Sequence, residues 1–311
     1  MQQKTISIIG FGNIGRFICA QLLPYANFSL KLNLIDHDEN VKGAILDFKH
    51  GLELFAQHEI HFNDPELLND SDLIFHCAGA AVPKGKSRIT TCAESIAITE
   101  SVYQNYKAKD SAFIIMVANP VEIIATVAHR ITGLAPHQIV GVGTYLDTIR
   151  MNYLIHQLDQ KFKEIDSVVL GEHGNTAFLS TSLSSVNGQK IEELIDEDQL
   201  HLVEKKMKSA ADEIKATQSA TIYGVGYCAM QLFYALMGGK ELKVASSVAI
   251  PNFLKDELGK GNVFLSLYST INQQGIQPIE HDYSATEIKK LKQSMNLIIS
   301  GIPERYLNDH Q

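Results

Sequence analysis

The 311-residue sequence lacks several features that mark secreted, membrane or metal-binding proteins. Its four cysteines, Cys19, Cys77, Cys92 and Cys228, include no CxxC pair, so we expect reduced, mostly buried thiols and no metal site. No apolar run approaches the roughly 18 residues needed to span a bilayer. The N-terminus enters a strand by Thr5 without the charged region, apolar region and cleavage site of a secretory signal. These absences predict a cytoplasmic protein that does not enter a membrane.

The chain also lacks an excess of positive charge. It carries 27 Lys and Arg against 35 Asp and Glu, a formal charge of −8, which argues against a general nucleic-acid binder. With 45% hydrophobic and 20% charged residues, the composition is that of a globular protein. There is no internal repeat and no low-complexity segment, and the length allows two domains with a well-buried core.

A glycine-rich turn opens the chain. The apolar run 4–9 predicts a buried strand, and it leads directly into Gly10-Phe11-Gly12-Asn13-Ile14-Gly15 and then a helical pattern at 16–23. In a GxGxxG turn, Gly10 makes the turn, Gly12 lets the backbone approach a pyrophosphate, and Gly15 lets the helix pack on the strand. Asp36 ends the next apolar run, 21 residues beyond Gly15, where an acid binds an adenosine ribose and repels a 2′-phosphate. We therefore predict an NAD site.

The rest of the pattern predicts an α/β protein of two parts. Apolar strands at 72–79, 112–118 and 139–143 alternate with helical stretches, which indicates a Rossmann-type, doubly wound parallel sheet over residues 1–143. From Thr144 the pattern changes to a long helix at 145–161, a turn at Asn187-Gly188 between antiparallel strands, further helices and strands, and a last helix at 284–300. We expect an α+β substrate domain over residues 144–311, packed on the first domain without a linker.

Several polar side chains stand where chemistry is expected. His173 lies in Gly171-Glu172-His173-Gly174 after an apolar strand, and histidine exchanges protons near neutral pH. Asp147 and Arg150 are three residues apart on one helical face, where a surface ion pair is the ordinary alternative. Asn119 follows the strand at 112–118, at the edge where open α/β sheets bind ligands. The basic segment 80–88 is either a surface loop or a lid that carries Arg88 over an anionic or carbonyl-bearing ligand.

The order of these motifs resembles the lactate/malate dehydrogenase family along most of the chain. The matching segments are the glycine turn with Asp36, Val41-Lys42-Gly43-Ala44-Ile45-Leu46-Asp47, Ser87-Arg88, Asn119-Pro120-Val121, Gly143-Thr144-Tyr145-Leu146-Asp147-Thr148-Ile149-Arg150 and Gly171-Glu172-His173-Gly174. The resemblance implies an NAD-dependent L-2-hydroxyacid dehydrogenase that acts on a small 2-oxo or 2-hydroxy acid. It also implies a homodimer or a homotetramer.

The resemblance assigns a role to each site residue. His173 would be the general acid and base, and Asp147 would hold its other ring nitrogen. Arg150 would bind the substrate carboxylate through two hydrogen bonds, and Arg88 would polarise the carbonyl. Asn119 and Thr221 would line the substrate site. The residues that would touch the dinucleotide are Ile14, Gly79, Ala80, Val117 and again Asn119.

One departure from the family bears on the substrate. Relatives choose their substrate largely through the residue six positions before the catalytic arginine, which is glutamine in lactate and arginine in malate dehydrogenases. Here that residue is Val82, which cannot neutralise a second carboxylate, so malate is disfavoured. An apolar residue there, with Asn175 after the His-Gly pair, resembles L-2-hydroxyisocaproate dehydrogenases, which reduce branched or bulky 2-oxo acids. L-Lactate dehydrogenase is the alternative, because extra methylenes change selectivity only by about 1–3 kcal/mol.

Further comparisons concern how the protein is regulated and to which functional class it belongs. Relatives activated by fructose 1,6-bisphosphate carry an arginine and a histidine where this chain has Asn152 and Asp166, so we predict no such activation. A catalytically silent NAD-binding module would lack His173, Arg88 or Arg150, and all three are present. A short-chain reductase would need a Tyr-x-x-x-Lys pair in the second half of the chain, where none stands.

Overall fold

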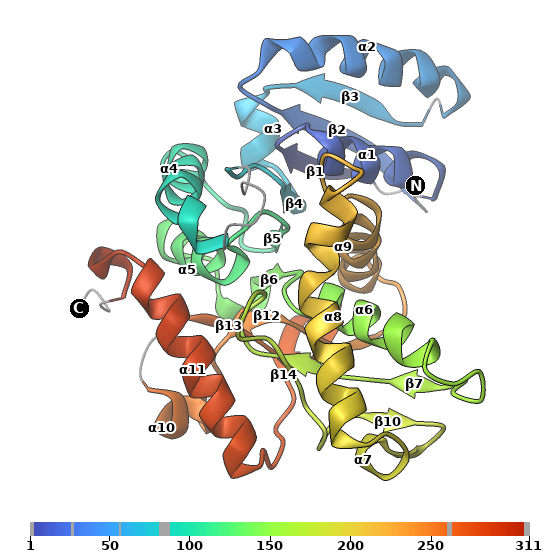
Figure 1. Ribbon diagram of the computed structural model, residues 1–311. Helices are drawn as coiled ribbons and strands as arrows, with labels where there is room; N and C mark the ends of the chain where they lie inside the picture. The colour runs from blue at the N-terminus through green and yellow to red at the C-terminus, as the bar shows by residue number, and fades with distance from the viewer. Residues whose placement is uncertain (1–2, 26–27, 56, 81–87, 260–262, 308–311) are drawn as a thin grey trace.

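One nine-stranded sheet organises the chain (Figure 1). The computed structural model describes residues 3–25, 28–55, 57–80, 88–259 and 263–307, with the backbone alone for Tyr25, Arg88 and Ile89. The sheet order is β14-β13-β12-β6-β5-β4-β1-β2-β3. Its strands are β1 Gln3–Ile9, β2 Ser29–Ile35, β3 Glu59–Phe62, β4 Leu73–His76, β5 Phe113–Met116, β6 Ile139–Gly141, β12 Leu242–Ala249, β13 Phe264–Asn272 and β14 Gly275–Pro278.

The six strands from the N-terminal half are parallel, as the sequence predicts. Apart from the edge strand β3, these strands are mostly apolar because they are covered on both faces, and in β1 every residue from Thr5 to Ile9 is buried. The order runs outward from β1 in both directions, so the chain reverses its winding beside β1 and β4. In sheets of this kind, ligands bind in the crevice beyond the carboxyl ends of the strands at that point.

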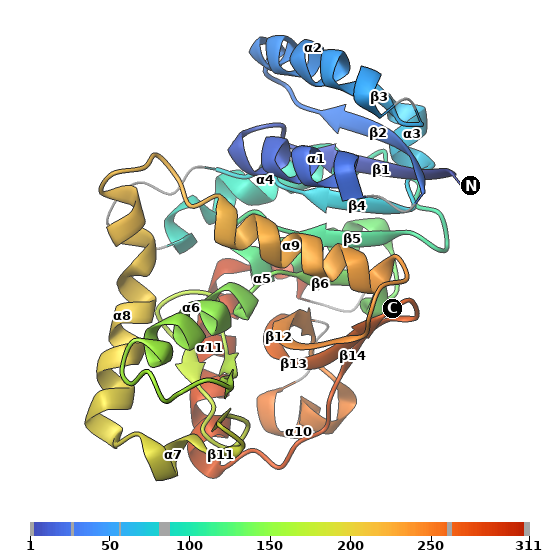
Figure 2. The same ribbon diagram turned by 90° about the vertical axis from the view of Figure 1, so that its right-hand side faces the viewer.

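Helices cover both faces of the sheet. Alternate residues of β5 point to opposite sides, so Ile115 shares a core cluster with Phe233 while Ile114 and Met116 share another with Ile124. Figure 2 shows α1 and α9 side by side, one from each half of the chain, and they pack together. The helices of the first half, short 3-10 turns aside, are α1 Asn13–Tyr25, α2 Lys42–Gly51, α3 Pro65–Asn69, α4 Cys92–Tyr103 and α5 Val121–Thr132.

The C-terminal half is α+β, as expected. Its helices are α6 Tyr145–His156, α7 Ile191–Leu194, α8 Glu197–Lys215, α9 Tyr223–Leu236, α10 Lys255–Leu258 and α11 Ala285–Gly301. Besides β12 to β14, the described residues of this half form the two-residue strands β7 Ile165–Asp166, β8 Val169–Leu170, β9 Phe178–Leu179, β10 Ser185–Val186 and β11 Gln189–Lys190. Helices α6 and α8 enclose a third core cluster that includes Met151, Ile155, Val203 and Met207.

The two halves share the sheet. Strand β12 runs antiparallel to β6, with Ser247 opposite Gly141. A side chain on Gly141 would bring its Cβ within 2.7 Å of the Ser247 Cβ, so the glycine permits this close approach. The sequence predicts packed domains, but the backbone hydrogen bonding continues across the boundary expected at residues 143 and 144.

Local sequence signals account for several turns and caps. Asn187 and Gly188 have φ of 51° and 76°, as a two-residue hairpin turn requires. Ser284 and Glu287 form the predicted capping box of α11, although that helix includes Gly301 instead of stopping before it. The helix predicted at 145–161 is too long, because a turn in which Lys161 N donates to Asp159 Oδ1 follows α6. In the described part of the chain, no helix is both long and apolar enough to cross a bilayer.

Candidate active site

His173 and Asp147 form a buried pair. Nδ1 of His173 lies 2.6 Å from Oδ2 of Asp147, and their side chains are 7% and 6% exposed. A carboxylate can only accept, so Nδ1 carries the proton of this bond, which makes Nε2 the proton-accepting nitrogen of the neutral ring. Asp147 stands in the first turn of α6 and His173 follows β8, so the pair joins two elements of the C-terminal half.

Arg150 completes the cluster from the next turn of α6. Its Nη1 lies 3.3 Å from Oδ1 of Asp147, and its side chain is only 12% exposed. The spacing of three residues therefore places both groups on one face, as predicted, but the face is buried and the surface ion pair is excluded. Burial raises the pKa of the nearby Cys228 thiol to about 12, so that cysteine stays protonated and unreactive.

The glycines around His173 have different structural reasons. Gly171 has φ of +100°, and its N–H and C=O both pair with Ser266 of β13, which fixes where the loop begins. The space beside Gly174 is filled by the carboxyl group of Glu172. A ligand therefore has no open space beside Gly174.

Glu122 holds the backbone of the His173 loop through a hydrogen bond, and the sequence did not predict this role. This side chain in the first turn of α5 is 2% exposed, and its Oε1 accepts from the backbone N–H of His173 at 3.2 Å. The same oxygen accepts from Ser266 Oγ at 3.0 Å, and Ser266 Oγ accepts from the N–H of Thr144, just before α6. Burial first, and Glu172 second, raise the pKa of Glu122 to about 8. The available signal was an acid among the apolar residues of the first turns of this helix.

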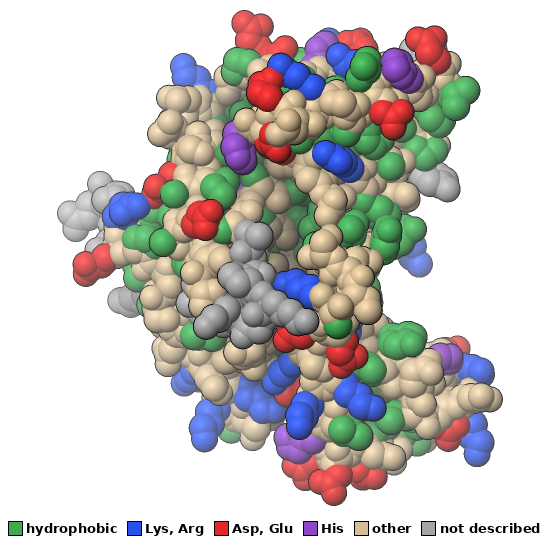
Figure 3. Space-filling model, turned by 45° about the horizontal axis from the view of Figure 1, so that its top comes forward, with side chains coloured by type: hydrophobic (Ala, Val, Ile, Leu, Met, Phe, Trp, Pro, Cys, Tyr) green, Lys and Arg blue, Asp and Glu red, His purple; other side chains and the backbone are tan. Residues whose placement is uncertain are grey.

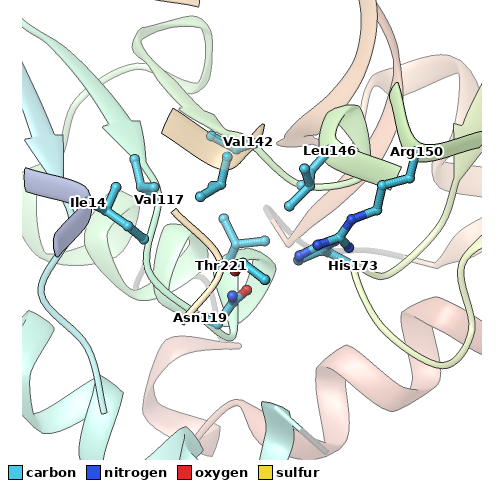
Figure 4. Close-up of a pocket in the computed structure, with 11 residues that line it drawn as sticks. Ile14, Val117, Asn119, Val142, Leu146, Arg150, His173 and Thr221 are labelled. Carbon is cyan, nitrogen blue, oxygen red and sulfur yellow. The ribbon is translucent and has the colours of Figure 1, made fainter. Parts of the chain in front are cut away.

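A pocket brings most of the predicted substrate residues together. Figure 4 shows Arg150 and His173 on one side and Ile14 and Val117 on the other, with Asn119 and Thr221 between them. Asn119 follows β5, as predicted, and its buried Oδ1 has no hydrogen-bond partner among the residues that the structure describes. The pocket is also lined by residues to which the sequence assigned no role. These are the apolar side chains of Val121, Val142, Leu146 and Val225 and the backbone of Gly143.

The glycine turn lies at the end of β1. Gly10 has φ of +88°, and any Cβ there would lie 2.6 Å from the backbone N of Ala78. Gly15 likewise packs against the Gly10 carbonyl, whereas a Cβ on Gly12 would meet nothing within 4 Å. Packing therefore explains two of the three glycines, and the open space beside Gly12 is where a ligand would approach.

The other predicted cofactor residues surround this turn. Asp36 follows β2, and its carboxylate accepts from the N–H groups of Phe11 at 2.7 Å and Asp38 at 2.9 Å. Gly79 follows β4, and a Cβ there would lie 2.9 Å from the Cβ of Ala118. The N–H of Ala80 donates to Ser95 Oγ at 3.2 Å. These positions lie at the crevice edge of the parallel sheet.

Two predicted residues have no described side chain. Val82 lies outside the described residues, and Arg88 begins the 3-10 turn Arg88–Thr91 with its backbone alone described. Asn175 is exposed, so its side chain adds no structural support to a substrate choice. Within the described ranges, no group of three or more His, Cys, Asp or Glu side chains is arranged to hold a metal ion.

Comparison with known proteins decides the family. A family model for the NAD binding domain of lactate/malate dehydrogenase matches residues 4–141, and one for the alpha/beta C-terminal domain of lactate/malate dehydrogenase matches residues 144–303. The chain belongs to the lactate/malate dehydrogenase family. It is an NAD-dependent oxidoreductase.

The individual relatives carry both family names. The L-lactate dehydrogenase of Clostridium botulinum is 25% identical over 303 residues, which cover 93% of each chain. A lactate dehydrogenase structure from a Medee basin deep-sea metagenome library has a TM-score of 0.82 at 24% identity, covering 97% of this chain and 98% of that one. The malate dehydrogenase structure from Plasmodium falciparum has a TM-score of 0.85 at 23% identity, covering 96% and 97%. At these identities the structures establish the fold and not the substrate.

The residues present fit NAD. The open space beside Gly12 and the start of α1 suit a pyrophosphate, because helix N-termini bind anions. Asp36 stands where a ribose hydroxyl would bind, and the buried Asn119 Oδ1 offers an acceptor between the glycine turn and His173. When bound, NAD supplies the group that takes or gives a hydride.

Proposed function

We propose that this enzyme interconverts a 2-oxo monocarboxylic acid and its L-2-hydroxy acid, with a branched-chain or broad substrate range like that of L-2-hydroxyisocaproate dehydrogenases. The observation that carries the proposal is the buried His173–Asp147 pair with Arg150 in the same pocket. A proton acceptor, its orienting carboxylate and a carboxylate-binding cation are what oxidation of a 2-hydroxy acid needs.

In the direction of oxidation, Nε2 of His173 accepts the hydroxyl proton while hydride leaves the adjacent carbon. Asp147 keeps the proton of Nδ1 in place and stabilises the imidazolium that forms. In the reverse direction the imidazolium returns the proton to the carbonyl oxygen. Because the pair is buried, its hydrogen bond is little weakened by solvent.

The other residues orient the substrate. Arg150 binds its carboxylate with two parallel hydrogen bonds, which a lysine could not reproduce. Asn119 and Thr221 contact the substrate from the pocket wall. Arg88, by resemblance to the family, polarises the carbonyl and stabilises the charge that develops on its oxygen.

The substrate proposal also rests on the described residues of the pocket, among which one cation is available for a substrate carboxylate. Among the described residues that line the pocket, Arg150 is the one permanently charged cation, and Val117, Val121, Val142, Leu146 and Val225 are apolar. A dicarboxylate such as malate would leave one charge unpaired in this setting. Val82 at the position that selects substrates in the family supports an apolar side chain, and pyruvate is the alternative.

The test compares NADH oxidation with pyruvate, 2-oxo-4-methylpentanoate and oxaloacetate by kcat/KM. We expect the branched acid to give the highest value and oxaloacetate the lowest. A clear preference for pyruvate would make the protein an L-lactate dehydrogenase, and a preference for oxaloacetate would overturn the substrate proposal. NADH binding without turnover of any 2-oxo acid would instead favour the catalytically silent module.

We also propose a homo-oligomer, either a dimer or a tetramer. A groove between α6, α8 and α9 is lined largely by apolar side chains, and large ones stand exposed at or near it, with Tyr153 at 65%, Tyr223 at 59% and Tyr227 at 53%. On α2, Leu46 is also 55% exposed. Such surfaces are usual in interfaces. Light scattering after gel filtration tests this, and a monomer would contradict it.

The division at residues 143 and 144 remains a proposal about organisation. It is supported by the change from parallel α/β to α+β structure and by the two family matches, which end at 141 and begin at 144. We likewise propose a cytoplasmic location, supported by four cysteines that form no disulfide. Fractionation of the source cells tests the location.

A further inference from the structure

Arg16 occupies an unusual position beside the glycine turn. It is the residue after Gly15 and the fourth residue of α1, and side chains on a helix point toward its N-terminus. Its Nε donates to the carbonyl oxygen of Phe11 at 3.1 Å, so the guanidinium is drawn back over the turn. This bond uses one of the five N–H groups of an arginine.

The positive charge of Arg16 lies near the N-terminus of α1, where a cation is electrostatically unfavourable. The N-terminus of a helix carries a partial positive charge, which disfavours a cation there. An acidic residue often compensates, but the first turn of α1 has none. A local choice of this kind that opposes stability is expected at functional sites.

Among the described residues, no carboxylate forms an ion pair with the Arg16 guanidinium. Within the described ranges, the bond to Phe11 is the one interaction of the Arg16 side chain, and no acidic residue lies within ion-pair distance. The carboxylate of Asp36, the predicted cofactor acid, accepts from the backbone of Phe11 and Asp38 instead. The remaining N–H groups of Arg16 are therefore available to an anion.

We propose that Arg16 binds the pyrophosphate of NAD, adding a charged contact to the N–H groups of the glycine turn. The guanidinium and the N-terminus of α1 then both bind the same anion. The negative charge of the pyrophosphate offsets the repulsion between these two positive groups. The open space beside Gly12 lies in the same turn. Figure 3 shows charges of both signs mixed over a hollowed face of the molecule, so a local contact and not a general positive field would attract the cofactor.

The test measures binding and not turnover. Calorimetric titration gives the Kd of NADH, of ADP-ribose, which keeps the pyrophosphate, and of adenosine, which has no phosphate. For Arg16→Ala we expect the Kd of NADH and of ADP-ribose to rise by roughly tenfold, with that of adenosine unchanged. Arg16→Lys keeps the charge without the planar fork and should fall between the two. Raising the salt concentration should weaken NADH binding more in the wild type than in Arg16→Ala.

Two controls separate binding from folding. Lys161→Ala removes one positive charge from an exposed turn after α6 and should leave every Kd unchanged. The Tm of unliganded Arg16→Ala should equal or exceed that of the wild type, because a cation is removed from a helix N-terminus. The increase in Tm that NADH causes should shrink in this variant.

Three outcomes would overturn the proposal. Unchanged Kd values for NADH and ADP-ribose in Arg16→Ala would exclude a phosphate contact. A lower Tm with unchanged affinity would leave Arg16 a structural role through Phe11 alone. An equal rise in the Kd of adenosine would assign the contact to the nucleoside and not to the pyrophosphate. None of these titrations contains a 2-oxo acid, so failure of the substrate proposal would not affect them.

Discussion

Nδ1 of His173 and Oδ2 of Asp147 lie 2.6 Å apart, although one follows β8 and the other stands on α6. The bond decides which ring nitrogen carries the proton. Because Asp147 also faces Arg150, one carboxylate orients both the proposed proton acceptor and the proposed carboxylate-binding cation. The first two predictions test each half of this arrangement.

Replacing Asp147 with asparagine should lower kcat strongly. The amide can donate to Nδ1, which moves the imidazole proton to Nε2 and removes the acceptor that oxidation needs. We expect a fall in kcat of about 100- to 10,000-fold, the usual contribution of general acid–base catalysis. NADH affinity should be unchanged in the same variant. Full activity of the Asp147→Asn variant would exclude the proposed role of the pair.

Replacing Arg150 with lysine should mainly affect substrate binding. A lysine keeps the charge but loses the bidentate geometry, so kcat/KM for the 2-oxo acid should fall by roughly 10- to 100-fold. Most of that loss should appear in KM. An unchanged KM would show that the carboxylate binds elsewhere. Arg130→Lys, on α5 outside the pocket, is a matched control.

Glu122→Ala tests the support beneath the loop. The substitution leaves the N–H of His173 and the hydroxyl of Ser266 without their acceptor, so the free energy of unfolding should fall by about 1–3 kcal/mol. Because the loop carries His173, kcat should fall as well. Glu122→Gln keeps an acceptor oxygen and should lose less of both. A destabilised variant with unchanged kcat would limit Glu122 to folding.

Because His76 is buried, we expect the folded protein to lose stability in mild acid. His76 is fully buried in β4, its Nδ1 lies 3.1 Å from the hydroxyl of Tyr103, and burial lowers its pKa from 6.5 to about 4. The folded protein therefore resists protonation that the unfolded chain accepts, so stability is complete above pH 6.5 and declines as the pH falls toward 4. At pH 5 this residue should cost about 2 kcal/mol of unfolding free energy. Urea titrations of wild type and His76→Gln at pH 8 and pH 5 measure the difference, and equal pH dependence would contradict the assignment.

Fructose 1,6-bisphosphate should not activate the enzyme. Asn152 uses its side chain inside the protein, where Oδ1 accepts from the N–H and the hydroxyl of Ser167. Asp166 is exposed and would repel a phosphate. The KM for the 2-oxo acid should stay constant as the sugar bisphosphate is added. A lower KM in its presence would contradict this prediction.

The parallel half of the fold could be predicted because its strands are short apolar runs covered on both faces. The edge strand β3 and the five-residue helix α3 were missed, since Glu59 and His61 interrupt the apolar pattern and α3 is too short to show a period. The pairing of β12 with β6 joins residues more than a hundred positions apart, which no local pattern encodes.

The site was predictable only in part. The glycine turn and Asp36 follow from spacing, because the strand–turn–helix geometry is local. The meeting of His173 with Asp147 came from the family resemblance, since nothing in their spacing requires it. Glu122 was missed because its partners lie 51 and 144 residues away along the chain. The substrate depends on Val82, which lies outside the described residues.

The bridge between β6 and β12 limits how this enzyme can move. Enzymes with two separate lobes can close around a substrate by rotating one lobe about a hinge. Here both halves contribute strands to the same hydrogen-bonded sheet. The glycine turn follows β1, and the His173 loop pairs with β13, so both are anchored to that sheet. Their separation is set by strand spacings of about 4.8 Å. Closure by segments outside the sheet would therefore leave the glycine turn and the His173 loop at the same distance from each other.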